Sequence, residues 1–175
     1  MGSDMSFRAM SLWLRLRERF GDPRSRLVEA GLEEGQTVLD YGCGVGSYTI
    51  PAARIVGADG LVYALDIHPL AIETVEKRKA RQNLANIRTI CSSRNSGLLD
   101  GSVDVVLLYD VLHSVGDQRG LLQELYRVLK PSGHLSILPD HMTKDELLET
   151  LGAGGWFSLQ TQHGEVLEFK KRADV

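Results

Sequence analysis

Strand-like and helix-like hydrophobic patterns alternate along this chain of 175 residues, and that alternation limits its fold more than any other feature. Runs that are aliphatic or β-branched at nearly every position are typical of parallel strands, which are covered on both faces. Such runs lie at residues 36–40, 61–66, 86–91, 103–108 and 133–138. The pattern predicts an α/β fold in which five parallel strands are joined by right-handed helical crossovers.

Helical periodicity identifies the crossover segments. We expect helices at residues 47–56, 69–82 and 118–130. Pro131 and Gly133 follow the last of these segments, and both residue types are suited to end a helix. Before the first strand, apolar residues at helical spacing over 7–20 predict an amphipathic helix that covers an edge or the mouth of the sheet.

The pattern changes after the fifth strand. A helix is expected at about 143–151, and two strand-like runs follow it at 156–162 and 165–171. Only His163 and Gly164 separate these two runs. Such a short link predicts an antiparallel hairpin.

Length and composition narrow the class of protein. The chain can bury one core, so we predict a single domain over 1–175, with a helical cover at 1–30 and a core at 31–171. No apolar run approaches the ~20 residues needed to cross a bilayer, and no secretory signal is recognised, so a cytoplasmic location is expected. A net charge of -3 creates no field to attract nucleic acid. Cys43 and Cys91 lack metal-ligand spacing, so two free thiols and no metal site are expected.

Three glycines follow the first strand directly, at Gly42, Gly44 and Gly46. Open parallel sheets bind their ligands beyond the carboxyl ends of the strands, and glycine lets a ligand approach the backbone closely. Asp66 ends the second strand, where its carboxylate can accept hydrogen bonds from both hydroxyls of a ribose. The glycines and Asp66 together favour an adenosine-containing ligand.

The glycine spacing separates two classes of adenosine ligand. A dinucleotide site reads G-x-G-x-x-G, and its last glycine would stand where this chain has Ser47. Asp40 immediately precedes the loop, and a carboxylate there suits a cationic amino-acid ligand better than a pyrophosphate. The pattern therefore favours a sulfonium ligand over NAD.

The segment Val-Leu-Asp-Tyr-Gly-Cys-Gly-Val-Gly at 38–46 resembles the nucleotide loop of class I S-adenosylmethionine-dependent methyltransferases, in particular the small-molecule, type 11 or UbiE-like group. Segments 64–67, 100–106 and 129–134 agree with that family in order and spacing, and the resemblance covers roughly 30–171. It implies a Rossmann-like three-layer sandwich with a mostly parallel seven-stranded sheet in the order 3-2-1-4-5-7-6, strand seven being antiparallel. It also implies S-adenosyl-L-methionine as cofactor.

The resemblance implies a set of cofactor-binding residues at the strand ends. They are Asp40, Tyr41, Gly42, Gly44, Gly46, Asp66, Ile67, Ser92, Ser93, Tyr109 and Asp110. Asp40 either contacts the ligand's ammonium group or braces the loop, and Tyr109 and Asp110 either line the sulfonium or pack against the next helix. Family members often carry Gly-Asp after strand three, whereas this chain has Cys91-Ser92. A hydroxyl is a weaker anchor for adenine than a carboxylate, so modest cofactor affinity is expected.

Two histidines are candidates for a general base. His113 follows strand four and His141 follows strand five, where the resemblance implies that the methyl acceptor binds. A histidine titrates near neutral pH and can remove a proton from an acceptor. The alternative for each is a packed, hydrogen-bonded side chain, and a base is needed only if the acceptor must lose a proton before attack.

The sequence thus predicts in-line methyl transfer to a small-molecule acceptor, whose identity it does not reveal. A second interpretation is a non-catalytic S-adenosylmethionine-binding regulatory or scaffold subunit, which the departure at Ser92 keeps open. An NAD-dependent oxidoreductase is a weaker third. The formation of a homo-oligomer also stays open.

Overall fold

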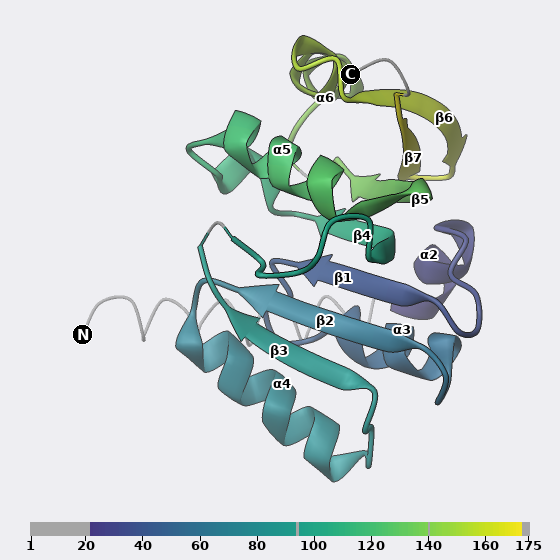
Figure 1. Ribbon diagram of the computed structural model, residues 1–175, viewed down its shortest axis with the longest axis vertical. Helices are drawn as coiled ribbons and strands as arrows, with labels where there is room; N and C mark the ends of the chain where they lie inside the picture. Colours follow the sequence, from purple (N-terminus) through teal and green to yellow (C-terminus); the bar gives the residue numbers. More distant parts are fainter. Residues whose placement is uncertain (1–21, 94, 140, 173–175) are drawn as a thin grey trace.

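Seven strands form one sheet in the computed structural model, which describes residues 22–93, 95–139 and 141–172. The strands are β1 Thr37–Tyr41, β2 Leu61–Asp66, β3 Ile87–Cys91, β4 Val103–Tyr109, β5 Leu129–Leu138, β6 Phe157–His163 and β7 Val166–Lys171. Their order is β3-β2-β1-β4-β5-β7-β6, with β7 antiparallel to both of its neighbours and the other pairs parallel (Figure 1). This confirms the predicted order and the predicted hairpin.

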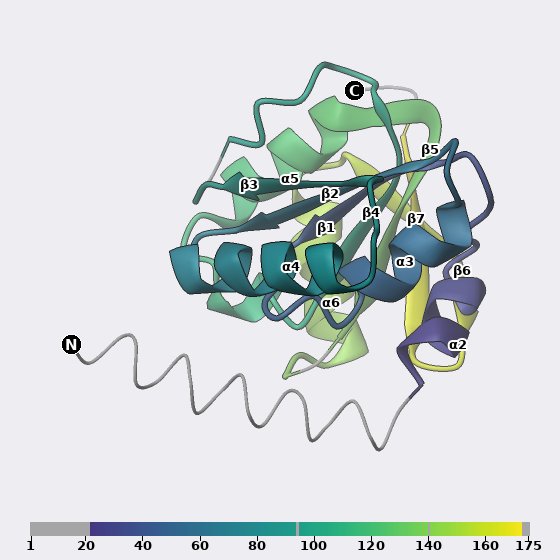
Figure 2. The same cartoon turned by 90° about the horizontal axis from the view of Figure 1, so that it is seen from below.

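Helices cover both faces of the sheet. They are α2 Pro23–Glu29, α3 Thr49–Val56, α4 Pro69–Arg81, α5 Gln118–Val128 and α6 Lys144–Ala153, with a single 3-10 turn, η1, at Leu112–Ser114. Figure 2 shows α5 on one side of the sheet and α3 and α4 on the other. One core cluster joins α5 and α6 to the sheet and a second joins α2, α3 and α4 to it. The three-layer sandwich is therefore confirmed.

Alternation along each strand assigns its side chains to the two clusters. In β1, Val38 belongs to the cluster beneath α2, α3 and α4, whereas Leu39 and Tyr41 belong to the cluster beneath α5 and α6. Burying a Val or Leu side chain fully contributes roughly 1.5–3 kcal/mol, and a shift of one residue would move every side chain to the wrong face. This register brings the carboxyl ends of β1, β2 and β4 to one edge.

The helix predicted at 118–130 ends two residues early. Leu129 already has extended backbone, with φ -67° and ψ 135°, and pairs with Val103 of β4. Its complete burial in the sheet outweighs the helical periodicity. Leu129 pairs with Val103, and the next pair in the ladder is His134 with Val105. Because β5 has more residues than β4 between these two pairs, the additional β5 residues bulge out of the ladder. The helix predicted at 47–56 begins at Thr49. Helix α2 lies within the predicted helical cover at 1–30, although no separate helix was predicted at 23–29, and the helix expected at 7–20 lies outside the described residues.

Candidate functional site

A cavity of about 690 Å³ opens at the carboxyl ends of β1, β2 and β4. It is lined by the glycine loop, the end of β2, the segment after β3, the segment from β4 to the start of α5, and His141. All the predicted site residues line it except Asp40 and Gly46. The predicted cofactor and acceptor positions thus share one hollow.

The glycine loop and Asp66 hold each other in place. The Gly44 N–H donates to Oδ2 of Asp66 at 2.9 Å, and the His68 N–H donates to Oδ1 at 2.8 Å. Gly42 has φ +79°, and a Cβ atom there would lie 2.2 Å from Cγ2 of Val111. The loop therefore requires glycine at 42 both for its backbone conformation and for its packing. Each Asp66 oxygen has two lone pairs, so a further acceptor position remains on each.

Asp40 and Gly46 support this loop from outside the cavity. Asp40 is 3% exposed, and its carboxyl accepts a hydrogen bond from the Thr49 hydroxyl at 2.5 Å, which ties β1 to α3. Burial raises the pKa of Asp40 to about 7, and the nearby Asp66 charge acts in the same direction against the Thr49 hydrogen bond. A Cβ on Gly46 would lie 3.1 Å from the Val75 side chain of α4. Of the two roles predicted for Asp40, the observed contact corresponds to bracing, made through Thr49.

Burial also suppresses the chemistry of two other groups in the cavity wall. It raises the pKa of the Cys43 thiol, and the neighbouring Asp40 and Asp66 charges raise it further, so the thiol stays protonated. Burial likewise raises the pKa of Tyr109, whose hydroxyl bonds that of Ser136 at 2.8 Å. Neither group is poised as a nucleophile.

Ser92 and Ser93 form the wall next to β3. The Ser92 hydroxyl donates to the Asn95 carbonyl at 2.7 Å, and its N–H donates to the Asp66 carbonyl at 3.0 Å. A serine hydroxyl has one donor hydrogen and two acceptor lone pairs. Such an acceptor is what an amino group on adenine requires.

The two candidate bases meet around Asp110. Its Oδ1 lies 3.6 Å from Nε2 of His141 and 3.9 Å from Nδ1 of His113, and the two imidazole centroids are 4.9 Å apart. Asp110 and His141 have φ +58° and +64°, the left-handed region that is costly for residues with a side chain. Strain of this kind persists where surrounding structure imposes it and is frequent at functional sites.

Sequence reasoning missed Tyr48, which forms an aromatic wall of the cavity together with the predicted Tyr109. The Tyr48 ring meets the Tyr109 ring edge-to-face at 4.6 Å between centroids, and Arg26 donates to the Tyr48 hydroxyl at 3.0 Å. Tyr48 follows Gly46 by two residues, and this closeness to the glycine loop could have identified it from the sequence. Val111, Val115 and Leu121 add an apolar surface.

Two negative findings concern the described residues only. Within them, no helix has the length and apolarity required to traverse a bilayer. The same part of the chain contains no group of three or more His, Cys, Asp or Glu side chains suited to a metal ion.

Comparisons with known proteins identify the family of the chain. A family model described as "Methyltransferase domain" matches residues 32–166. The demethylmenaquinone methyltransferase of Geobacillus sp. (strain WCH70) is 33% identical over 139 residues, which are 79% of this chain and 56% of that protein. The chain spans about half the length of the curated relatives it matches first.

Solved structures are similar over more of their length. A SAM dependent methyltransferase from Aquifex aeolicus has a TM-score of 0.76 and 27% identity, covering 87% of this chain and 89% of that one. A protein described as a putative S-adenosyl-L-methionine-dependent methyltransferase from Methanococcus maripaludis has a TM-score of 0.80 at 18% identity, covering 97% and 94%. The second likeness concerns the fold alone.

Proposed function

Since this chain belongs to the methyltransferase family whose domain model it matches over 32–166, we propose that it transfers a methyl group from S-adenosylmethionine to a small-molecule acceptor. Membership confirms the resemblance to class I S-adenosylmethionine-dependent methyltransferases. The observation that carries the proposal is the single cavity that joins the glycine loop and Asp66 to the group formed by Asp110, His113 and His141.

The residues at the β1 and β2 ends fit the cofactor. Gly42 and Gly44 let the backbone approach it, and Asp66 would accept hydrogen bonds from the ribose hydroxyls with the lone pairs left by Gly44 and His68. Ile67 would cover the base, and Ser92 and Ser93 would accept from its amino group. Tyr41, Tyr109 and Asp110 would line the amino-acid and sulfonium part, with Asp40 and Gly46 supporting the loop.

When bound, S-adenosylmethionine supplies a methyl carbon activated by a positive sulfur. That group would supply the methyl for a nucleophilic electron pair of the acceptor, with the carbon–sulfur electrons returning to sulfur. The chain's own contribution is alignment and exclusion of water, worth roughly 7–11 kcal/mol when geometry is ideal. For an acceptor that must lose a proton, His113 or His141 would receive it.

We propose further that the acceptor carries an ionisable hydroxyl group. Two imidazoles held around one carboxylate suit removal of a proton, and the tyrosine and aliphatic walls suit an apolar ring. The name of the Geobacillus relative makes a water-soluble 1,4-naphthoquinol the first probe, with catechol as a second hydroxylated ring.

Ligand binding and turnover test the proposal separately. S-adenosylmethionine and S-adenosylhomocysteine should each raise the melting temperature, since a ligand at 100 times its Kd adds about 2.7 kcal/mol, whereas NAD should not. Asp66→Asn should abolish this stabilisation, and Asp59→Asn, an exposed carboxylate outside the cavity lining, should leave it intact. Transfer of labelled methyl to the quinol probe should then follow. Stabilisation by NAD alone, or by none of the three, would overturn the assignment; binding without transfer to either ring would favour a non-catalytic subunit.

A further inference from the structure

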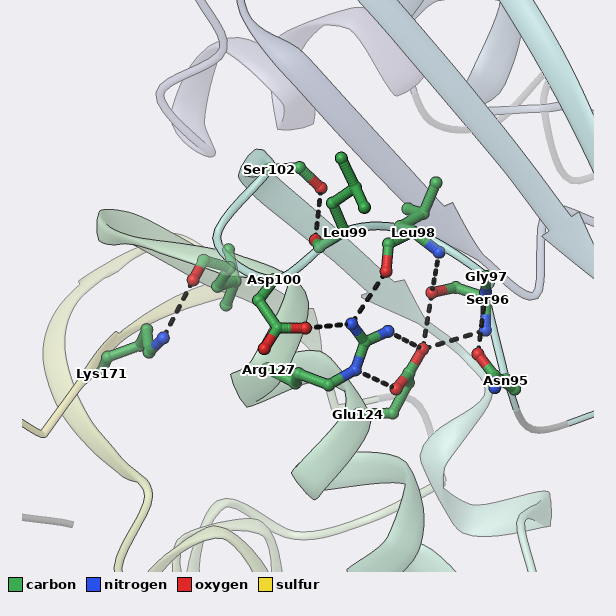
Figure 3. Close-up of polar contacts among 11 residues, drawn as sticks. Asn95, Ser96, Gly97, Leu98, Leu99, Asp100, Ser102, Glu124, Arg127 and Lys171 are labelled. Atoms are coloured by element: carbon green, nitrogen blue, oxygen red, sulfur yellow. Dashed lines mark hydrogen bonds and ion pairs between the residues drawn. The ribbon is translucent and has the colours of Figure 1, made fainter.

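Residues 95–102 lie between β3 and β4 without regular secondary structure, and side chains of α5 bond to them. Figure 3 shows the contacts, in which Glu124 and Arg127 reach from α5 to the backbone and side chains of this segment. The two charged residues lie one turn apart on α5 and bond each other as well as the segment. They therefore act as one anchoring unit.

Glu124 holds the beginning of the segment. Its side chain is 12% exposed, and Oε1 accepts hydrogen bonds from the Ser96 N–H at 2.9 Å and from the Ser96 hydroxyl at 2.6 Å. Burial of the carboxyl raises its pKa, but the hydrogen bonds from Arg127 and Ser96 outweigh burial and bring the pKa to about 2. Glu124 is therefore ionised throughout the physiological range.

Arg127 holds the middle and the end. Its guanidinium donates to Glu124 through Nε and Nη2, and through Nη1 to the Leu98 carbonyl at 2.8 Å and to the Asp100 carboxylate. The backbone carbonyl of Arg127 also accepts from the Gly101 N–H at 2.9 Å. Because one planar fork serves all these acceptors, a lysine could not replace it.

The anchored segment is hydrogen-bonded to the cavity wall. Asn95 precedes Ser96, and its carbonyl accepts the Ser92 hydroxyl, while its side-chain oxygen accepts the Gly97 N–H at 2.8 Å. Leu121, one turn before Glu124 on α5, lines the same cavity. Helix α5 thus touches the acceptor side directly and reaches the adenine side through Glu124.

We propose that Glu124 and Arg127 are positioning residues that keep Ser92 and Ser93 where they can bind the amino group of adenine. The inference rests on the proposed function, because it concerns the same cavity. Ser92 and Ser93 stand where a carboxylate after β3 would otherwise bind adenine. Hydroxyl groups are weaker anchors than a carboxylate, so their placement matters more.

The positioning role can be tested by comparing two ligands that differ only in their purine base. The probes are S-adenosylhomocysteine and S-inosylhomocysteine, in which a carbonyl oxygen replaces the amino group. The wild-type protein should prefer the adenosine compound by roughly 10-fold, the value of about one hydrogen bond. Glu124→Gln should reduce that ratio to about one, because the amide group presents N–H donors toward those of Arg127 and Ser96. Calorimetry measures both Kd values.

Glu76→Gln is the matched control. Glu76 lies on α4, accepts the Thr89 hydroxyl of β3 at 2.9 Å and pairs with Lys79 one turn later, and it is not one of the residues that line the cavity. This variant should keep the wild-type ratio. Amide exchange of Ser96 in ligand-free protein should accelerate in Glu124→Gln and stay unchanged in the control. If Glu124→Gln does not fold, Arg127→Lys, which keeps the charge, takes its place with the same expectation.

Three other outcomes of the binding experiment would contradict the proposal. An equal loss of affinity for both compounds, or an unchanged ratio in Glu124→Gln, overturns the positioning role and leaves cofactor binding in place. A wild-type protein that binds both compounds equally overturns the reading of the amino group by the serines. A wild-type protein that binds neither overturns the proposed function and this inference with it.

Discussion

Asp40 lies beneath the glycine loop, almost wholly buried, with its carboxyl bonded to Thr49. Burial raises its pKa from 3.8 to about 7. The folded state therefore binds more protons than the unfolded state between these two values, so this residue's contribution to stability falls as pH rises from about 4 to 7 and stays low above 7.

Asp40→Asn should remove that dependence. The amide has the same shape and its oxygen can still accept from Thr49, but it does not ionise. The variant should gain stability relative to wild type between pH 4 and pH 8, by up to about 4 kcal/mol. Urea unfolding at both pH values measures the difference. Parallel pH profiles for the two proteins would show that Asp40 is not the titrating group.

His113 and His141 call for a kinetic comparison. If either receives the acceptor's proton, its replacement by glutamine should lower kcat by about 10²–10⁴-fold at unchanged Kd for S-adenosylhomocysteine. His163→Gln supplies the control, because His163 is exposed on β6 and does not line the cavity. Full turnover in both cavity variants would mean that the acceptor needs no protein base.

The contact between the glycine loop and the chain after β4 belongs to the scale of elements. Gly42→Ala should lower the free energy of unfolding by roughly 1–3 kcal/mol, because it combines a positive φ with a 2.2 Å approach to Val111. Gly35→Ala has the same backbone conformation with open space around it and should cost only the backbone part. Val111→Ala in the Gly42→Ala background should recover part of the loss. Equal costs at 42 and 35 would contradict the packing argument.

The order and direction of the elements could be predicted from the sequence, because hydrophobic periodicity and the family resemblance both report them. Boundaries set by tertiary contacts could not. Leu129 leaves the helix because it pairs with Val103, and nothing local to residue 129 records that partner. Helix α2 is only seven residues long, begins with Asp22 as its cap and buries Leu27, too little periodicity to detect.

The candidate site likewise has features that could be predicted from the sequence and features that could not. Residues at the strand ends were predicted to share a cavity because parallel strands bring their carboxyl ends together, and the structure places Asp66, Ser92 and Tyr109 around one hollow. The approach of His141 to Asp110 depends on the register of β4 and β5, which sequence reasoning did not resolve. Glu124 was not identified from the sequence, because its contact with Ser96 spans 28 residues.

At the scale of the whole molecule, stability and binding should separate. Phe169 of β7 is 1% exposed and belongs to the core shared with α5 and α6. In the strand order, β7 lies toward the opposite edge of the sheet from β2. Phe169→Ala should lower the free energy of unfolding by about 3–5 kcal/mol while the folded protein keeps its Kd for S-adenosylhomocysteine. Leu159→Ala, at a partly exposed position on β6, should cost far less. A weakened Kd in Phe169→Ala would show that the far edge of the sheet shapes the cavity.

The cavity's two walls also have a simple order in time. The lining residues between Tyr41 and Ser93 form one wall and those between Tyr109 and His141 form the other, so a ribosome finishes the proposed nucleoside side before it starts the proposed acceptor side. A recombination point between them would exchange acceptor preference while the glycine loop is inherited intact. Because Glu124 accepts two hydrogen bonds from Ser96, a crossover that keeps both halves functional lies before residue 95. Residues 95–102 and α5 are then inherited from the same parent.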